Sequence, residues 1–150
     1  MRGAIPTLAM TISLLTVAAD AFDAQGADII GLRLGMPEAE VVMALGHQGF
    51  SATRDRDALI AKTRDGNLTI DLMGSRVHEI RYEFQARGAG EADKIATSIL
   101  DRFGSPNQTN PMSWCQSNGR DGTCPPQAAS LTFFPETRTL VLRAGTPMPP

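Results

Sequence analysis

The sequence has few residues of the kinds that build catalytic or metal sites. Among its 150 residues there are only two cysteines, Cys115 and Cys124, and two histidines, His47 and His78. It contains no G-x-S-x-G turn, no phosphate-binding glycine loop and no H-E-x-x-H pair. An enzyme needs positioned acids, bases or nucleophiles. The sequence therefore predicts a protein that is not an enzyme and that uses no cofactor and no metal.

A surplus of positive charge is also lacking. There are 14 Lys and Arg residues against 16 Asp and Glu residues, for a net charge of −2. Binding of nucleic acid through its phosphates needs an excess of basic side chains, so we expect no nucleic-acid partner. Beyond the N-terminal region, no apolar run approaches the roughly 20 residues that cross a bilayer as a helix. We therefore expect no membrane span in the mature chain.

Residues 1–21 have the pattern of a secretory signal peptide. Arg2 supplies a positive charge, residues 5–19 carry none, and Ala19-Asp20-Ala21 places small residues at the −3 and −1 positions of a cleavage site. A membrane anchor is the alternative, but this uncharged stretch is shorter than the roughly 20 residues a span requires. We expect cleavage after Ala21, with Val17-Ala18-Ala19 as the other candidate site, and a mature domain of residues 22–150. No cysteine follows that could carry a lipid, so the protein is predicted to be periplasmic or secreted.

Export changes the interpretation of the two cysteines. In an oxidising compartment, an isolated pair nine positions apart is most simply a disulfide. The spacing differs from the C-x-x-C of thioredoxin-type redox sites, and no second cysteine pair or nearby histidine completes a zinc site. We predict a structural disulfide between Cys115 and Cys124. On the chain-entropy account it restrains the unfolded chain by about 2.5 kcal/mol.

A short helix is predicted over residues 37–46. Pro37 suits the first helical position, where its missing N–H costs nothing. Val41, Val42 and Leu45 fall on one face at helical spacing and mark the face expected to be buried. Gly46 is expected to end the helix in a left-handed conformation. At this length the helix needs packing to be stable, and we expect the upstream apolar residues 29–34 to supply it.

A second helix of the same design is predicted within residues 91–104. Ile95, Ile99 and Phe103 follow one another at i+4 positions and form one apolar face. Gly104 is expected to end the helix, and Pro106 follows closely, as is usual after a helix stop.

Three strands are predicted after each helix. Residues 58–63, 68–73 and 76–84 follow the first helix, and residues 112–116, 130–134 and 138–144 follow the second. The half-repeats are expected at about 29–84 and 91–144, with a linker at 85–90 and a frayed tail at 145–150. We therefore expect an α+β fold. Two similar halves, each of one helix plus three strands, would form one antiparallel sheet with the helices on one face.

The first half resembles a known family. Gly35 and Met36, the acid-rich short helix with Val41, and then Leu45-Gly46 are similar to the opening motif of the small outer-membrane assembly lipoproteins of the SmpA/OmlA (BamE) type. Those proteins share a helix-plus-antiparallel-sheet fold with the β-lactamase-inhibitor proteins, which are tandem copies of it. The resemblance implies a module that works by binding another protein. This chain lacks the lipid-bearing cysteine of those lipoproteins, so their place on the outer membrane is not implied.

Trp114 is the only tryptophan and stands beside Cys115. One interpretation is that it packs in the core against the disulfide. The other is that Met112 and Trp114, which share a strand face, are an exposed anchor for a partner, because Trp and Met are enriched at the centres of interfaces. Met112 and Trp114 are therefore the candidate partner-binding residues.

The remaining polar residues have ordinary structural interpretations. His47 follows a predicted helix end and is expected in a loop, whereas His78 is expected at the rim of the sheet. Asp55 and Asp57 alternate with arginines but lack the continuation of a calcium loop. We expect a solvated loop or an edge strand there, whose alternating charge discourages pairing between sheets.

Our first functional hypothesis is a non-catalytic periplasmic or secreted protein-binding module. Its partner would be another envelope or secreted protein, in cell-envelope assembly or in inhibition of that protein. The alternative is a carrier of a small ligand in a pocket between helices and sheet, lined by Val41, Leu45, Ile99 and Phe103. A hydrolase, the third possibility, has no motif behind it.

Overall fold

The structure is a computed structural model that describes residues 22–88, 90–115 and 123–146. The predicted signal peptide and the last four residues of the predicted tail lie outside this part of the chain. The two helices are α1 (Glu38–His47) and α2 (Glu91–Phe103). The strands are β1 (Ala52–Asp55), β2 (Ala58–Lys62), β3 (Gly66–Met73), β4 (Arg76–Phe84), β5 (Gln108–Thr109), β6 (Met112–Cys115), β7 (Ser130–Phe134) and β8 (Thr139–Arg143).

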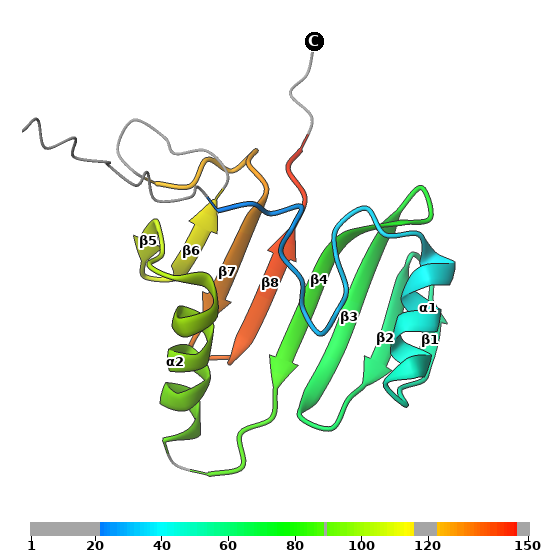
Figure 1. Cartoon of the computed structure of the whole chain (residues 1–150), viewed down its shortest axis with the longest axis horizontal. Coiled ribbons are helices and arrows are strands. Elements are labelled where there is room, and N and C mark those ends of the chain that lie inside the picture. The colour runs from blue at the N-terminus through cyan, green and yellow to red at the C-terminus, as the bar shows by residue number, and fades with distance from the viewer. Residues whose placement is uncertain (1–21, 89, 116–122, 147–150) are drawn as a thin grey trace, which may run out of the picture.

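The strands form one antiparallel sheet in the order β1-β2-β3-β4-β8-β7-β6-β5 (Figure 1). The first four strands and the last four each pair with their neighbours in sequence. The two sets join where β4 pairs with β8, with Ile80 opposite Leu142 and Tyr82 opposite Leu140. The long connection between the sets contains α2.

The predicted fold class was wrong in two respects. Each half contributes four strands rather than three, because β1 and the two-residue β5 extend the sheet at its edges. The helices were expected to cover one face of the sheet. They lie instead toward its two ends, α1 near β1 and α2 near β5, and neither packs clearly on the face (Figure 1). Residues 22–37, which contain neither helix nor long strand, occupy the space between them.

This N-terminal segment is itself part of the core. Ile29, Leu32 and Leu34 are almost fully buried, and Ala24 and Ala27 with them. The apolar run at 29–34 was expected to support the first helix. It fills the middle of the core because the space between two short helices is too wide for their own side chains to close. Residues 22–37 thus cover the part of the apolar sheet face that the helices were predicted to cover.

The helix ends differ between the halves. Pro37 precedes α1 in an extended conformation, and Gly46 lies inside the helix rather than ending it. The left-handed position falls three residues later at Gly49, with φ 83°. The helix continues because Leu45, which is fully buried, accepts backbone hydrogen bonds from the residues that close its last turn. For α2 the prediction is confirmed: Gly104 ends it with φ 77°, and its N–H donates to the Leu100 carbonyl at 2.8 Å.

The strands alternate as the sequence predicted. Leu68, Ile70 and Leu72 of β3 face the core, as do Ile80 and Tyr82 of β4. The opposite face of β4 carries charged residues. There Glu79 is 7% exposed and accepts hydrogen bonds from Arg143 Nε at 2.6 Å and from Arg81 at 2.8 Å.

The predicted disulfide is confirmed. Cys115 and Cys124 form a disulfide with a Cα–Cα distance of 5.5 Å, which joins the end of β6 to the segment before β7. Within the residues that the structure describes, no helix has the length and apolar character needed to cross a bilayer.

Candidate functional site: an apolar groove beside α2

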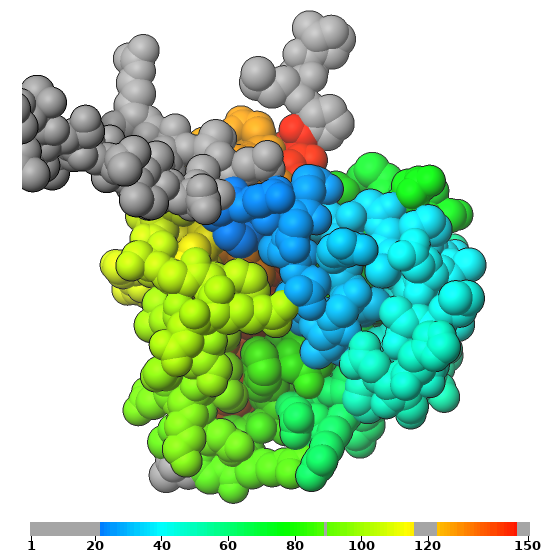
Figure 2. Space-filling view, in the orientation of Figure 1, coloured from blue at the N-terminus to red at the C-terminus, as the bar shows by residue number. Residues whose placement is uncertain are grey.

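An apolar hollow lies between α2 and the N-terminal segment. Its volume is about 360 Å³, and it is open to solvent. Figure 2 shows it as the depression between the yellow-green surface of α2 and the blue surface of the N-terminal segment, with green strand residues below. The lining residues come from three places: Ile29 and Ile30 of the N-terminal segment; Tyr82, Phe84 and Leu140 of β4 and β8; and Glu91, Lys94, Ile95, Ser98, Ile99, Arg102 and Phe103 of α2.

One wall is a tight two-residue turn. Ile29 and Leu32 exchange two backbone hydrogen bonds, each of 3.0 Å, so Ile30 and Gly31 form the tip. Both tip residues have positive φ, 48° at Ile30 and 82° at Gly31. This is the type I′ arrangement, which favours Asn or Gly at its first central position. A β-branched residue there is a conformational outlier, so Ile30 holds its place in the groove at a cost in backbone energy.

Polar contacts hold this turn to both helices. Asp28 accepts hydrogen bonds from the Gly31 N–H at 2.9 Å and from Arg102 at 2.5 Å. On the other side, Gln48 donates to the Ile30 carbonyl at 2.8 Å. Partial burial raises the pKa of Asp28, but the hydrogen bonds from Gly31 and Arg102 outweigh it and leave the pKa below its ordinary value. Asp28 is therefore ionised at neutral pH and keeps Arg102 in place.

Aromatic residues form the floor. The rings of Tyr82 and Phe84 meet edge to face with centroids 4.6 Å apart. The Tyr82 hydroxyl shares a 2.7 Å hydrogen bond with Thr63. Burial raises the pKa of Tyr82, helped by nearby Asp65, and the bond to Thr63 offsets this only in part. Tyr82 is therefore neutral at physiological pH, and the floor carries no charge of its own.

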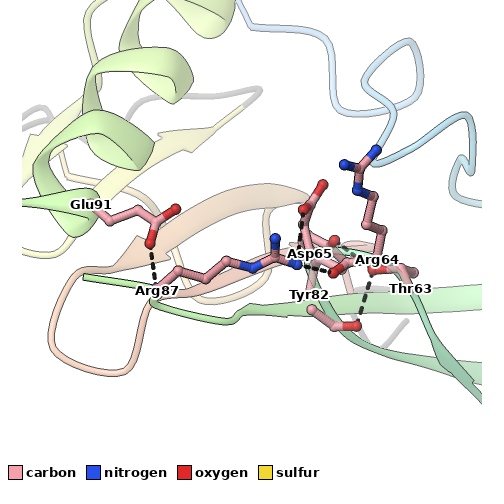
Figure 3. Close-up of polar contacts among 7 residues, drawn as sticks. Thr63, Arg64, Asp65, Tyr82, Arg87 and Glu91 are labelled. Atoms are coloured by element: carbon pink, nitrogen blue, oxygen red, sulfur yellow. Dashed lines mark hydrogen bonds and ion pairs between the residues drawn. The ribbon is translucent and has the colours of Figure 1, made fainter.

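A polar network fixes the lower end of the groove (Figure 3). Arg87 follows β4 and donates a 2.7 Å hydrogen bond to the Arg64 carbonyl, and it lies 3.7 Å from the Asp65 carboxylate. The backbone N–H of Arg87 donates to the Glu91 carboxylate in the first turn of α2. These contacts tie the β2–β3 turn to the start of α2. These polar contacts, in addition to the chain between β4 and α2, hold the start of α2 in place against the sheet and so help to set the width of the groove.

The charged side chains that line the groove differ in whether they have a partner within the described chain. Arg102 is paired with Asp28 and lies over the Phe103 ring, 5.1 Å from its centroid. Glu91 accepts the Arg87 N–H. The exposed Lys94 ammonium makes no ion pair or side-chain hydrogen bond with any described residue. It is the one cationic group of the groove lining that has no partner among the described residues.

The sequence-based candidates divide between this groove and the core. Ile99 and Phe103, proposed as pocket residues, do line the groove. Val41 and Leu45, proposed with them, are both fully buried on the inner face of α1 and lie outside the groove. Val42, expected on the same face, is 45% exposed. The helical spacing could not show that α2 leaves part of its apolar face uncovered beside the N-terminal segment.

Trp114 is a core residue in this structure. It is 1% exposed, its Nε1 donates to the Gly104 carbonyl at 3.1 Å, and its ring centroid lies 6.0 Å from that of Phe103. This placement fits the core-packing interpretation. Met112, its neighbour on β6, is partly buried. Partner binding through Met112 and Trp114 stays a prediction, and it would require Trp114 to be reached behind α2.

The other polar candidates lie outside the groove. His47 is exposed at the end of α1, and His78 is partly buried on β4. Asp55 and Asp57 are exposed at the β1–β2 turn, where β1 is an edge strand. Among the described residues, no three His, Cys, Asp or Glu side chains come together in a way that could hold a metal ion. What the groove offers chemically is apolar contact with charge at its rim.

Sequence reasoning missed Ile30, Tyr82 and Lys94 as groove residues. An apolar residue before glycine is not a sequence signal for a turn, so the turn at Ile30-Gly31 could not be predicted from these two residues. Only Asp28, three residues before Gly31, hinted at a turn by its side chain's capacity to accept a backbone N–H. Comparison with known proteins adds no assignment: no family model, no curated protein and no solved structure matches this chain. The resemblance to the envelope assembly lipoproteins therefore stays a prediction.

Proposed function

We propose that this chain is a non-catalytic binding protein that captures a small apolar molecule in the groove beside α2. The observation that carries the proposal is the groove itself, whose volume of about 360 Å³ lies within the range of small-molecule sites. Apolar and aromatic side chains supply most of its lining, and polar groups stand only at its rim and lower end. That distribution is typical of sites that bind by burial and orient by a few polar contacts.

The strained turn supports the same conclusion. Holding Ile30 at φ 48° costs backbone energy that asparagine or glycine would avoid. The side chain is only partly buried, so packing within the chain returns only part of that cost. An apolar side chain held in such a conformation at the wall of an apolar groove is best explained by contact with a ligand.

We further propose that the protein works in the periplasm or outside the cell. The signal-peptide pattern of residues 1–21 and the Cys115–Cys124 disulfide support this location, since structural disulfides persist in oxidising compartments. A role in envelope assembly, as the family resemblance implies, is compatible with such a binding protein. The geometry favours a small ligand over a protein partner, because Trp114, one of the two candidate anchor residues, is buried.

The test is titration of the mature protein with N-phenyl-1-naphthylamine, a neutral apolar dye that fluoresces when it leaves water. We expect saturable binding of one dye per chain. Ile95→Asn changes a groove residue on α2 and should weaken binding by about fivefold or more, because it removes buried apolar contact. Ile60→Asn is the matched control, since Ile60 is exposed on β2 and lies outside the groove.

Two results would contradict the proposal. One is the absence of saturable dye binding to the folded wild-type protein. The other is equal loss of binding in both variants, which would place the dye elsewhere on the surface. Native mass spectrometry of protein purified from cells adds an independent measurement, because a resident ligand appears as a discrete added mass that Ile95→Asn should diminish.

A further inference from the structure

We infer that the natural ligand of this groove is an anionic amphiphile, an apolar chain that ends in a carboxylate, with the carboxylate paired to Lys94. This inference rests on the proposed function, because it names the chemical class that the same groove takes. It follows from which charges of the lining are already occupied and from where the groove can and cannot accept a charge.

The cations of the lining are not equivalent. Arg102 donates to Asp28 and stacks over Phe103, so it is committed to holding the N-terminal turn against α2. Lys94 lies two turns earlier on the same helix and has no such commitment to any described residue. An exposed lysine extends its apolar stem along the wall while its ammonium remains in water. It therefore offers a positive charge at the rim without disturbing the fold.

The single anion of the lining is directed elsewhere. Glu91 accepts the Arg87 backbone N–H, and in Figure 3 its carboxylate points toward Arg87 at the lower end. Its place in the first turn of α2 adds the favourable field of the helix N-terminus. A cationic ligand would have to compete with the Arg87 N–H for the Glu91 carboxylate, in a groove whose lining also carries the cations Lys94 and Arg102. A carboxylate ligand meets the one cation that has no partner in the described chain.

The floor sets the orientation of the ligand. Tyr82, Phe84 and Leu140 present apolar surface, and the Tyr82 hydroxyl is already bonded to Thr63. A charge placed there would lose its water without gaining a partner, which is costly. The apolar end of the ligand therefore points to the floor and the Ile30 wall, and the carboxylate stays at the rim beside Lys94.

The test compares three ligands of one chain length: decanoate, decanol and decylamine, each displacing N-phenyl-1-naphthylamine from the mature protein at neutral pH. We expect decanoate to bind tightest and decylamine weakest. Lys94→Gln should weaken decanoate about two- to fivefold, the range of an ion pair exposed to water, and leave decanol unchanged. Lys94→Arg should restore decanoate binding, because it keeps the charge.

The chain supplies its own control. Lys62 and Lys94 are its only lysines, and Lys62 is exposed on β2 outside the groove. Lys62→Gln changes net charge by the same amount and should leave all three affinities as in the wild type. If decanol binds as tightly as decanoate, or if Lys94→Gln weakens both alike, the anionic class is wrong while the apolar binding site stands. If neither ligand nor dye binds, the proposed function fails and this inference with it.

Discussion

Replacing Ile30 by asparagine should separate ligand binding from stability. At φ 48°, a β-branched residue pays about 1–2 kcal/mol for the left-handed conformation, and asparagine before Gly31 is among the preferred pairs for this turn. Against that gain stands the lost burial of a half-buried side chain, about 1 kcal/mol. The free energy of unfolding should therefore change by no more than about 1 kcal/mol, whereas dye affinity should fall about five- to tenfold.

Two other asparagine substitutions serve as comparisons for Ile30→Asn. Ile95→Asn removes a groove side chain from α2 with no backbone strain to release. It should cost about 1–2 kcal/mol more stability than Ile30→Asn. Arg56→Asn relieves a positive φ of 54° at the exposed β1–β2 turn, away from the groove. It should leave dye affinity unchanged and stabilise the fold slightly.

Urea denaturation followed by circular dichroism measures stability, and fluorescence titration measures binding. A loss of 2 kcal/mol or more in Ile30→Asn would mean that the side chain is needed for the core and that no strain is released. Unchanged dye affinity in a folded Ile30→Asn protein would mean that the turn does not contact the ligand. Either result would remove the turn from the argument for a ligand site.

Three further substitutions test the fold by denaturation. Trp114→Ala should destabilise the fold by about 3–5 kcal/mol, whereas loss of partner capture with unchanged stability would make Trp114 an anchor instead. Burial raises the pKa of Glu79, but Arg143 foremost and Arg81 hold it below its ordinary value. Glu79→Gln should therefore cost about 1–2 kcal/mol at neutral pH. That difference should shrink as pH falls from the ordinary pKa of an unfolded glutamate, about 4.3, through the lower pKa of the folded carboxylate, and a difference independent of pH would contradict the ion-pair account. Tyr82→Phe should cost about 1 kcal/mol by removing the bond to Thr63 and keep dye affinity, whereas loss of dye binding would give the hydroxyl a role in the site.

Local patterns predicted most of the regular elements. The alternation of apolar and polar residues predicted the bounds of β4 (76–84) and β7 (130–134) correctly. It could do so because side chains of a strand alternate between the buried and the exposed face. The end of α2 at Gly104 was likewise readable. Gly46 failed as a helix end because glycine can also be tolerated within a helix whose buried face continues, and Leu45 keeps α1 packed.

The edges of the sheet were harder. The residues of β1 carry alternating charge and only one partly buried side chain, so they have no hydrophobic pattern to mark a strand. They pair with β2 through the backbone alone, and the sequence does not encode backbone pairing. The same holds for the two residues of β5. Because β1 and β5 lack a hydrophobic pattern, the sequence predicted only three strands in each half.

By itself, the sequence determined the element types, the apolar face of each helix, the cysteine pair and the absence of common catalytic motifs. These features depend on composition and on short-range periodicity, which can be recognised from residues that are close together in the sequence. Only the tertiary structure decided that residues 22–37 fill the space between the helices and that Ile30, with its strained backbone, lies at the groove wall. It also decided that Lys94, at the rim, has no partner among the described residues. Those features depend on residues brought together from N-terminal segment, sheet and α2. Distances of that kind follow from the packing of the whole chain rather than from any local pattern.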